Sequence, residues 1–193
     1  TIFQRSKQWA APFAKFKKEV PSSVRFLLRE VPYYQEWYRQ RLSWIFNDRI
    51  HYSLQKDPDW PHPERSINKY NDRQRDHFTD YVKEQLGDRQ DLLCEVLPDY
   101  PPFGKRMLMD NGWFRTVARD DVTLVTGGIS HVRENSIVTD KGVAHEVDII
   151  VIATGFDALN MIGSFNLYGR DGKTIREVWA EKGAEAFYGV AIP

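Results

Sequence analysis

The stretch Asp148-Ile-Ile-Val-Ile-Ala-Thr-Gly155 is the clearest single element of this 193-residue sequence. A continuous apolar run of this kind is typical of a central strand that is buried on both faces of a parallel sheet. Parallel strands are joined by crossover connections, which are usually helices. The stretch therefore predicts an α/β architecture.

The chain before this strand divides into two zones of different composition. Residues of about 10–100 are rich in Trp, Tyr, Arg and Gln and contain almost no Gly, which predicts helices. Residues 122–155 are rich in Val, Ile, Thr and Gly, which predicts strands.

Apolar spacing and turn residues place the individual elements. One helix is predicted to begin just after Pro32, with its aromatic stripe in the core. A second is predicted to start at an N-cap of Asn71 or Asp72 and to end at Gly87. The three prolines of Asp57–Pro63 predict a loop between these helices. The other expected elements are a helix over 107–118, a strand over 121–125, a hairpin turning at 140–142, a turn at 168–172, a short helix through Trp179 and a final strand.

The composition excludes several classes of protein. Its 27 Lys and Arg balance 27 Asp and Glu, so the chain lacks the basic surplus of most nucleic-acid-binding modules. No apolar run reaches the roughly 20 residues that span a bilayer, and the first residues do not form a signal peptide, so we predict a cytoplasmic protein without a membrane partner. Cys94 is the one cysteine and is predicted to be a small buried hydrophobe. The five histidines have no ligand-like spacing, so we predict no metal site.

Both termini differ from the usual ends of a natural domain. Ile2-Phe3 is strand-like from the start, without the polar residues that usually precede a first strand. Tyr188–Pro193 is an apolar, strand-like run with nothing after it. We therefore expect an internal piece of a larger protein, which can carry residues of a site without the complete site.

Two basic pairs are the candidates for binding chemistry, because the sequence has no nucleophile elbow, no H-E-x-x-H motif and no glycine-rich phosphate loop. Arg5 and Ser6 follow a predicted strand, and ligands of open α/β sheets bind at the carboxyl ends of strands. A guanidinium beside a hydroxyl suits a 2′-phosphate. Lys105 and Arg106 follow a Pro- and Gly-containing segment that directs the two cations apart. Spacing alone leaves open that both pairs are simply solvated.

Several short motifs, taken together, resemble the class B flavoprotein monooxygenases, and most closely the Baeyer–Villiger monooxygenases. Ala153-Thr-Gly-Phe-Asp157 is similar to the A-T-G-F motif of that family, and Phe3-Gln-Arg-Ser6 is similar to its F-Q-R-[ST] stretch. Lys105-Arg106 matches its K-R pair. Tyr168–Gly172 resembles the start of its return into the FAD domain. The residues around Leu97–Trp113 are most similar to the 4-hydroxyacetophenone monooxygenase branch.

The resemblance implies part of a Rossmann-like NADPH-binding domain that is interrupted by a helical insertion, with a short return into an FAD-binding domain. The implied parts are an NADPH-domain strand at 1–10, the insertion at 11–100, the rest of the NADPH domain at 101–154, and a linker with a partial FAD domain at 155–193. The family's glycine-rich loops would lie before Thr1, so the chain by itself is expected to be inactive.

The resemblance also assigns roles to individual residues. Arg5, Ser6 and Lys105 would bind the 2′-phosphate of NADPH. Arg106 matches the family's essential arginine, which lies near the flavin, helps to place the nicotinamide and stabilises the negatively charged flavin peroxide. The residues that would belong to the linker between the NADPH and FAD domains are Thr154, Gly155 and Asp157.

The implied enzyme uses FAD and NADPH to insert one oxygen atom of O2 next to a ketone carbonyl, and an aryl ketone is the expected substrate. Two alternatives stay open. One is a flavin-containing monooxygenase that oxidises sulfur or nitrogen, and the other is a helical interaction module that binds a protein partner. The aromatic content also leaves a homo-oligomer open.

Overall fold

The computed structural model describes residues 1–15, 17–155 and 166–188. The chain divides into two compact units, Thr1–Asp148 and Ile149–Pro193. In the described ranges, no helix has the length and apolar character needed to cross a membrane.

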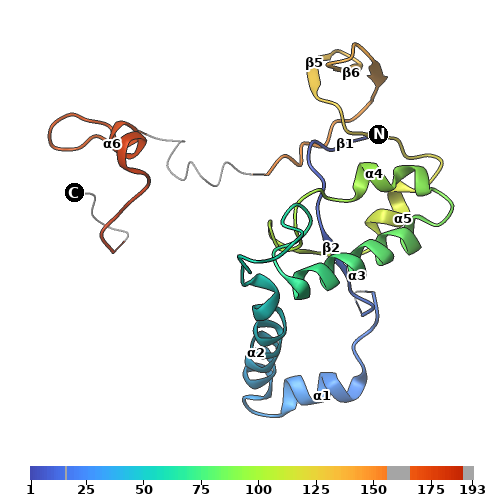
Figure 1. Cartoon of the computed structure of the whole chain (residues 1–193), viewed down its shortest axis with the longest axis vertical. Coiled ribbons are helices and arrows are strands. Elements are labelled where there is room, and N and C mark those ends of the chain that lie inside the picture. The colour runs from blue at the N-terminus through green and yellow to red at the C-terminus, as the bar shows by residue number, and fades with distance from the viewer. Residues whose placement is uncertain (16, 156–165, 189–193) are drawn as a thin grey trace. The chain divides into compact units, whose positions relative to one another are not determined.

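The first unit contains two short parallel strand pairs, whose first strands, β1 and β2, are labelled in Figure 1. β1 (Ile2–Phe3) pairs with β4 (Leu124–Val125). β2 (Ala10–Pro12) pairs with β3 (Leu108–Asp110), with Ala10 opposite Leu108. Each pair joins segments that lie far apart in the sequence with helices between them, which confirms the predicted α/β class.

Helices occupy the chain between β2 and β3. They are α1 (Ser22–Glu30), α2 (Tyr34–Leu54), α3 (Lys69–Leu86), the 3₁₀ turn η1 (Gln90–Leu92) and α4 (Leu93–Val96). The predicted start of α2 after Pro32 and the end of α3 at Gly87, which has φ +56°, are confirmed. The predicted N-cap of α3 is wrong, because the side-chain oxygen of Asn68 accepts the first N–H groups of that helix.

The core of the first unit forms where α3 meets β2 and α5 (Trp113–Val117). Val82 and Leu86 of α3 pack with Ala10 of β2 and with Phe114 and Val117 of α5, and these five side chains are 0–6% exposed. Figure 1 shows α3 running alongside β2. This packing fixes the β2–β3 pair against the helical segment.

The predicted helix over 107–118 is wrong, because Leu108–Asp110 forms β3 and helix α5 covers only Trp113–Val117. Asp110 explains the change from strand to helix. Its Oδ1 accepts the backbone N–H groups of Gly112 and Trp113 at 2.8 and 2.7 Å, which satisfies the first donors of α5.

An antiparallel sheet follows β4. Its strands are β5 (Ile129–Arg133), β6 (Ser136–Thr139) and β7 (Ala144–Glu146). The predicted turn at residues 140–142 is confirmed, with Gly142 at φ +79°. The prediction missed the turn between β5 and β6, so the expected hairpin is a three-stranded sheet.

The prediction of a buried central strand at Asp148–Gly155 is wrong. The described part of the chain assigns no strand to this segment, and Ile149, Val151 and Ile152 are 80–83% exposed. A strand forms only when its backbone N–H and C=O groups find a neighbouring strand. The strand pairs of the described residues, β1–β4, β2–β3, β5–β6 and β6–β7, do not include this run.

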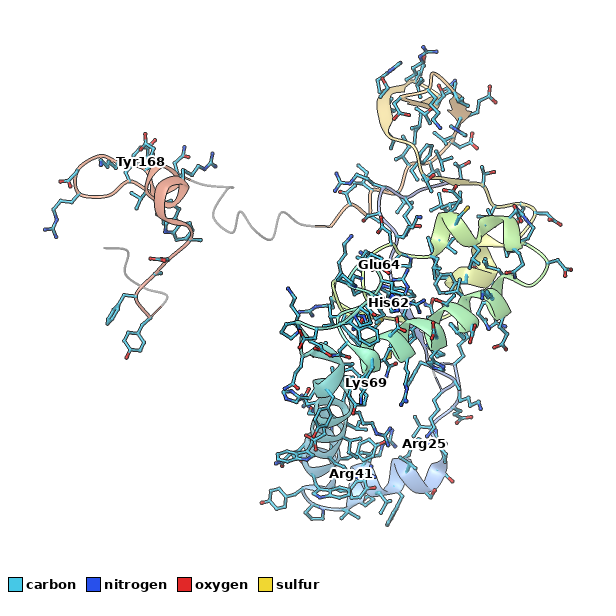
Figure 2. All side chains as sticks on the ribbon, viewed as in Figure 1. Arg25, Arg41, His62, Glu64, Lys69 and Tyr168 are labelled. Atoms are coloured by element: carbon cyan, nitrogen blue, oxygen red, sulfur yellow. The ribbon has the colours of Figure 1, made fainter. Side chains whose placement is uncertain are left out.

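The predicted burial of the aromatic stripe on α2 is also wrong. Trp37, Trp44 and Phe46 are 53–67% exposed. The guanidinium carbon of Arg41, which is labelled on α2 in Figure 2, lies 5.9 Å from the ring centroid of Trp37. Apolar periodicity identifies the helix, whereas burial depends on a covering element that the described residues do not supply for this face. Cys94 is likewise exposed instead of buried.

In the second unit, α6 (Ile175–Lys182) follows a turn that is closed by a bridge between Tyr168 and Thr174. Thr174 and Glu177 form a reciprocal capping box at the start of the helix. The predicted turn and short helix are confirmed. The predicted final strand, Tyr188–Pro193, falls on residues 189–193 after its first residue, and those lie outside the described residues.

Candidate functional site

Arg5 and Ser6 directly follow the β1 ladder at the carboxyl end of a parallel pair. The Gln4 N–H donates to the Val125 carbonyl at 2.9 Å, so the ladder extends to the residue before Arg5. Both side chains are exposed, and neither bonds or pairs with any residue that the structure describes. A cation and a hydroxyl are therefore available at the sheet edge where α/β proteins bind ligands.

The neighbouring strand β4 is followed by Thr126-Gly127-Gly128, which the sequence alone did not single out. The Thr126 hydroxyl donates to Glu95 Oε2 at 2.8 Å, and the Gly128 N–H donates to Asp140 Oδ2 at 3.3 Å. A Cβ on Gly128 would lie 3.1 Å from that oxygen, so a larger residue here would displace the Asp140 carboxylate by a few tenths of an ångström. The carboxylates of Glu95 and Asp140 thus lie beside the end of β4 and would repel an anion there. An anionic ligand is therefore favoured beside Arg5, at the end of β1. A glycine pair directly after a predicted strand was the signal that could have found this edge.

Lys105 and Arg106 lie in the loop that leads into β3. The Gly104 N–H donates to the Pro101 carbonyl at 3.0 Å, and a Cβ on Gly104 would lie 3.0 Å from the same oxygen, so this turn requires glycine. The ammonium nitrogen of Lys105 lies 4.7 Å from the ring centroid of Tyr100, a cation–π contact. Arg106 is exposed and has no partner within the described ranges.

Tyr100 connects the two basic pairs. Its hydroxyl donates toward the Lys7 carbonyl oxygen at 3.0 Å, two residues after Arg5, while its ring lies against Lys105. The Trp9 indole N–H donates to the Tyr100 carbonyl at 2.9 Å. Burial raises the pKa of Tyr100, which favours the neutral hydroxyl as a donor. Lys7, Trp9 and Tyr100 therefore form one hydrogen-bonded framework, and both basic pairs lie next to it in the sequence or in space.

Arg75 of α3 anchors this framework from the helical segment. Its guanidinium donates to the carbonyl oxygens of Arg65, Pro98 and Tyr100 at 3.0–3.3 Å. Burial lowers the pKa of Arg75, and arginine stays charged in proteins all the same. No sequence pattern points to this residue, because it binds backbone carbonyls from separate segments.

The remaining predicted site residues lie elsewhere in the chain. Thr154 and Gly155 belong to the second unit, and both are exposed. Asp157 lies outside the described residues. The structure thus brings the two basic pairs onto one framework in the first unit.

Comparison with known proteins gives relatives over the whole chain, although no family model matches it. The chain is 50% identical over 192 residues to an uncharacterized monooxygenase of Sinorhizobium fredii, a match that covers 100% of this chain and 29% of that protein. It is 28% identical to a Baeyer–Villiger monooxygenase of Streptomyces coelicolor, over 98% of this chain and 34% of that protein. A Baeyer–Villiger monooxygenase of Pseudomonas aeruginosa is 37% identical over 56% of this chain and 20% of its own length.

Solved structures share the fold. Oxidized steroid monooxygenase bound to NADP matches with a TM-score of 0.63 at 23% identity, over 98% of this chain and 40% of that one. Cyclohexanone monooxygenase bound to ε-caprolactone matches with a TM-score of 0.65 at 22% identity, over 92% of this chain and 39% of that one. The chain spans about a third or less of the length of the curated relatives named above. It is a homologue of the Baeyer–Villiger monooxygenases.

Proposed function

We propose that this chain forms the NADPH-binding side of a flavin-dependent Baeyer–Villiger monooxygenase. The observation that carries the proposal is the exposed Arg5–Ser6 pair at the carboxyl end of β1, next to Lys7, whose carbonyl accepts the Tyr100 hydroxyl while the Tyr100 ring contacts Lys105. The complete reaction is part of the proposal, because the chain spans 29% of its S. fredii relative.

The basic residues fit the group that distinguishes NADPH from NADH. A 2′-phosphate is a small dianion, and a planar guanidinium engages two of its oxygens at once. Arg5 provides that guanidinium, Ser6 provides a hydroxyl donor, and Lys105 adds a second cation. Because none of these three groups is committed to a carboxylate in the described structure, binding phosphate breaks no ion pair.

Arg106 is the proposed catalytic group. It follows the Gly104 turn, and its charge is not neutralised by a described carboxylate, so it would be able to hold the nicotinamide and stabilise negative charge beside the flavin. FAD, when bound, supplies the redox chemistry with O2. The chain has no glycine-rich pyrophosphate loop, so its own residues would act from the nicotinamide side.

Thr154 is proposed to end the NADPH domain and, together with Gly155 and Asp157, to connect it to the FAD domain. Gly155 has φ +79°, a backbone conformation that favours glycine and suits a bend between two domains. The proposed boundaries are those of the sequence analysis, with the insertion at 11–100 and the linker beginning at residue 155.

The proposed reaction converts a ketone, O2 and NADPH into an ester, and the proposed substrate is an aryl ketone. Support for the aryl group comes from the resemblance of Leu97–Trp113 to the 4-hydroxyacetophenone monooxygenase branch. A cytoplasmic location is part of the same proposal. Oxidation of sulfur or nitrogen would use the same cofactors, so product analysis has to distinguish it.

A second candidate function is an interaction module for a protein partner. The observation in its favour is the exposed aromatic face of α2, with Trp44 at 67% exposure. Binding of NADP⁺ in preference to NAD⁺ by the protein would count against this candidate.

The test measures flavin absorbance and then NADPH consumption and ester formation with 4-hydroxyacetophenone in the holoenzyme. We expect Arg106→Ala to retain flavin and lose ester formation, whereas Arg29→Ala, an exposed arginine of α1, keeps the activity. A colourless wild-type protein, or an Arg106→Ala variant with full ester formation, would contradict the proposal.

A further inference from the structure

A cavity lies at the carboxyl end of the β2–β3 pair, and none of the residues of the NADPH proposal lines it. Its volume is about 260 Å³, below the roughly 300–1,000 Å³ of pockets for drug-sized ligands. Pro12 and Asp110 stand opposite each other as the last residues of the two parallel strands, and both line the cavity. The cavity therefore occupies the edge where ligands bind in open α/β sheets, and its size suits a small molecule.

The charges around this cavity favour an anion. Asp110 is 5% exposed, and its two oxygens already accept the N–H groups of Gly112 and Trp113 and the Tyr81 hydroxyl. Lys17 and Arg115 also line the cavity, and neither has an acceptor or an ion pair within the described ranges. Two uncommitted cations thus face one carboxylate whose charge is dispersed over three donors.

Tyr81 adds no negative charge to the cavity. Its hydroxyl donates to Asp110 Oδ2 at 2.8 Å, and burial together with that bond raises the pKa of Tyr81 to about 12. The hydroxyl therefore stays neutral at working pH.

Besides the two cations, the cavity has a hydrogen-bond acceptor without a donor among the described residues, the side-chain oxygen of Gln85. Its side-chain oxygen is buried and has no hydrogen-bond partner in the described structure, although the residue lines the cavity. A buried acceptor without a donor is unfavourable, and a donor carried by a ligand relieves the cost. Pro12, Phe13 and Ala14 form an apolar wall beside these polar groups.

We propose that this cavity binds a small hydroxycarboxylate. The carboxylate lies against Lys17 and Arg115, the hydroxyl donates to the Gln85 side-chain oxygen, and the short alkyl part packs on Pro12 and Phe13. A plain carboxylate would leave Gln85 unsatisfied, and a neutral alcohol would leave the two cations without an anion. The site uses none of the proposed NADPH-binding residues, so a failure of either proposal would leave the other unaffected.

The test titrates the ¹⁵N-labelled full chain with 3-hydroxybutyrate, butyrate and butanol at constant ionic strength. We expect saturable shifts of the Gly112 amide and of the Gln85 side-chain amide with 3-hydroxybutyrate. Butyrate should bind more weakly and butanol should not bind. Lys17→Gln and Arg115→Gln should each weaken binding by about tenfold, the loss expected for one charge-assisted hydrogen bond.

Matched controls come from charged residues close in sequence that do not line the cavity. Lys15→Gln is the control for Lys17→Gln, and Arg119→Gln is the control for Arg115→Gln. Dispersed spectra of each variant show that the fold is intact. The proposal is overturned by an absence of saturable shifts at millimolar ligand, by equal affinity for butyrate, or by control variants that weaken binding as much as the test variants.

Discussion

The guanidinium carbon of Arg75 lies 5.3 Å from the ring centroid of Trp9, and this contact joins the helical segment to the chain that follows β1. Trp9 is 2% exposed and donates its indole N–H to the Tyr100 carbonyl, which Arg75 also binds. One arginine therefore holds the framework that carries both basic pairs of the candidate site.

Replacing Arg75 should destabilise the fold. Arg75→Ala leaves the carbonyls of Arg65 and Pro98 without this donor, and we expect a loss of about 2–4 kcal/mol in the free energy of unfolding. Urea denaturation measures it. Arg73→Ala, on an exposed position of the same helix, should cost less than about 0.5 kcal/mol. Equal losses in the two variants would show that Arg75 is not an anchor.

Arg5 should determine the preference for NADP⁺. Removing a bidentate phosphate contact in Arg5→Ala should weaken NADP⁺ binding by about 10- to 100-fold and leave NAD⁺ binding unchanged. Isothermal titration calorimetry of the holoenzyme with both nucleotides provides the measurement, and Arg29→Ala serves as the control. A parallel loss for NAD⁺ would place Arg5 away from the 2′-phosphate.

Tyr81 should make stability depend on pH in the alkaline range. The pKa of Tyr81 rises from 10.0 to about 12 in the fold, so the native state favours the neutral hydroxyl. The stabilisation is complete below pH 10 and is lost as pH rises through about 12.

Tyr81→Phe tests this prediction. The variant should lose about 1–2 kcal/mol at neutral pH, the value of the bond to Asp110, and part of the alkaline dependence. Chemical denaturation at several pH values measures both effects. Tyr70→Phe, at a 44% exposed position, is the control and should behave as wild type. Identical alkaline profiles for Tyr81→Phe and wild type would refute the assignment.

Gly104 should be required for the turn before Lys105. A Cβ at this position meets the Pro101 carbonyl oxygen at 3.0 Å and Tyr100 Cδ2 at 3.1 Å, so Gly104→Ala should cost about 1–3 kcal/mol. It should also weaken NADP⁺ binding, because Lys105 lies on the Tyr100 ring. Gly169→Ala is the control, since its Cβ would make an ordinary contact of 3.6 Å. Thermal denaturation that ranks the two variants equally would contradict the close approach.

Proline and glycine residues in the sequence predicted where helices begin and end and where one turn lies. The start of α2 after Pro32, the end of α3 at Gly87 and the turn at Gly142 follow from proline and glycine geometry, and all three are present. Burial could not be predicted in the same way. The exposed faces of Trp44 and Ile152 show that apolar character does not by itself determine which element covers a residue.

The candidate site was predictable only as separate pieces. Arg5 and Lys105 could be selected because each follows a strand or a tight turn. Their connection through Tyr100 depends on the pairing of β2 with β3, which brings together segments that no sequence period relates. Gln85 and Arg115 gave no signal, since both lie in ordinary polar positions of helices.

The exposed run Ile149–Ile152 has a consequence for the behaviour of the chain in concentrated solution. Its side chains are exposed, and we expect such a β-branched segment, once extended, to pair with the same segment of another molecule and to stack as a steric zipper. Asp148 is the charge that directly precedes the run, in the position of a gatekeeper residue. Neutralising it would remove the electrostatic repulsion between stacked copies and hasten the formation of cross-β aggregates.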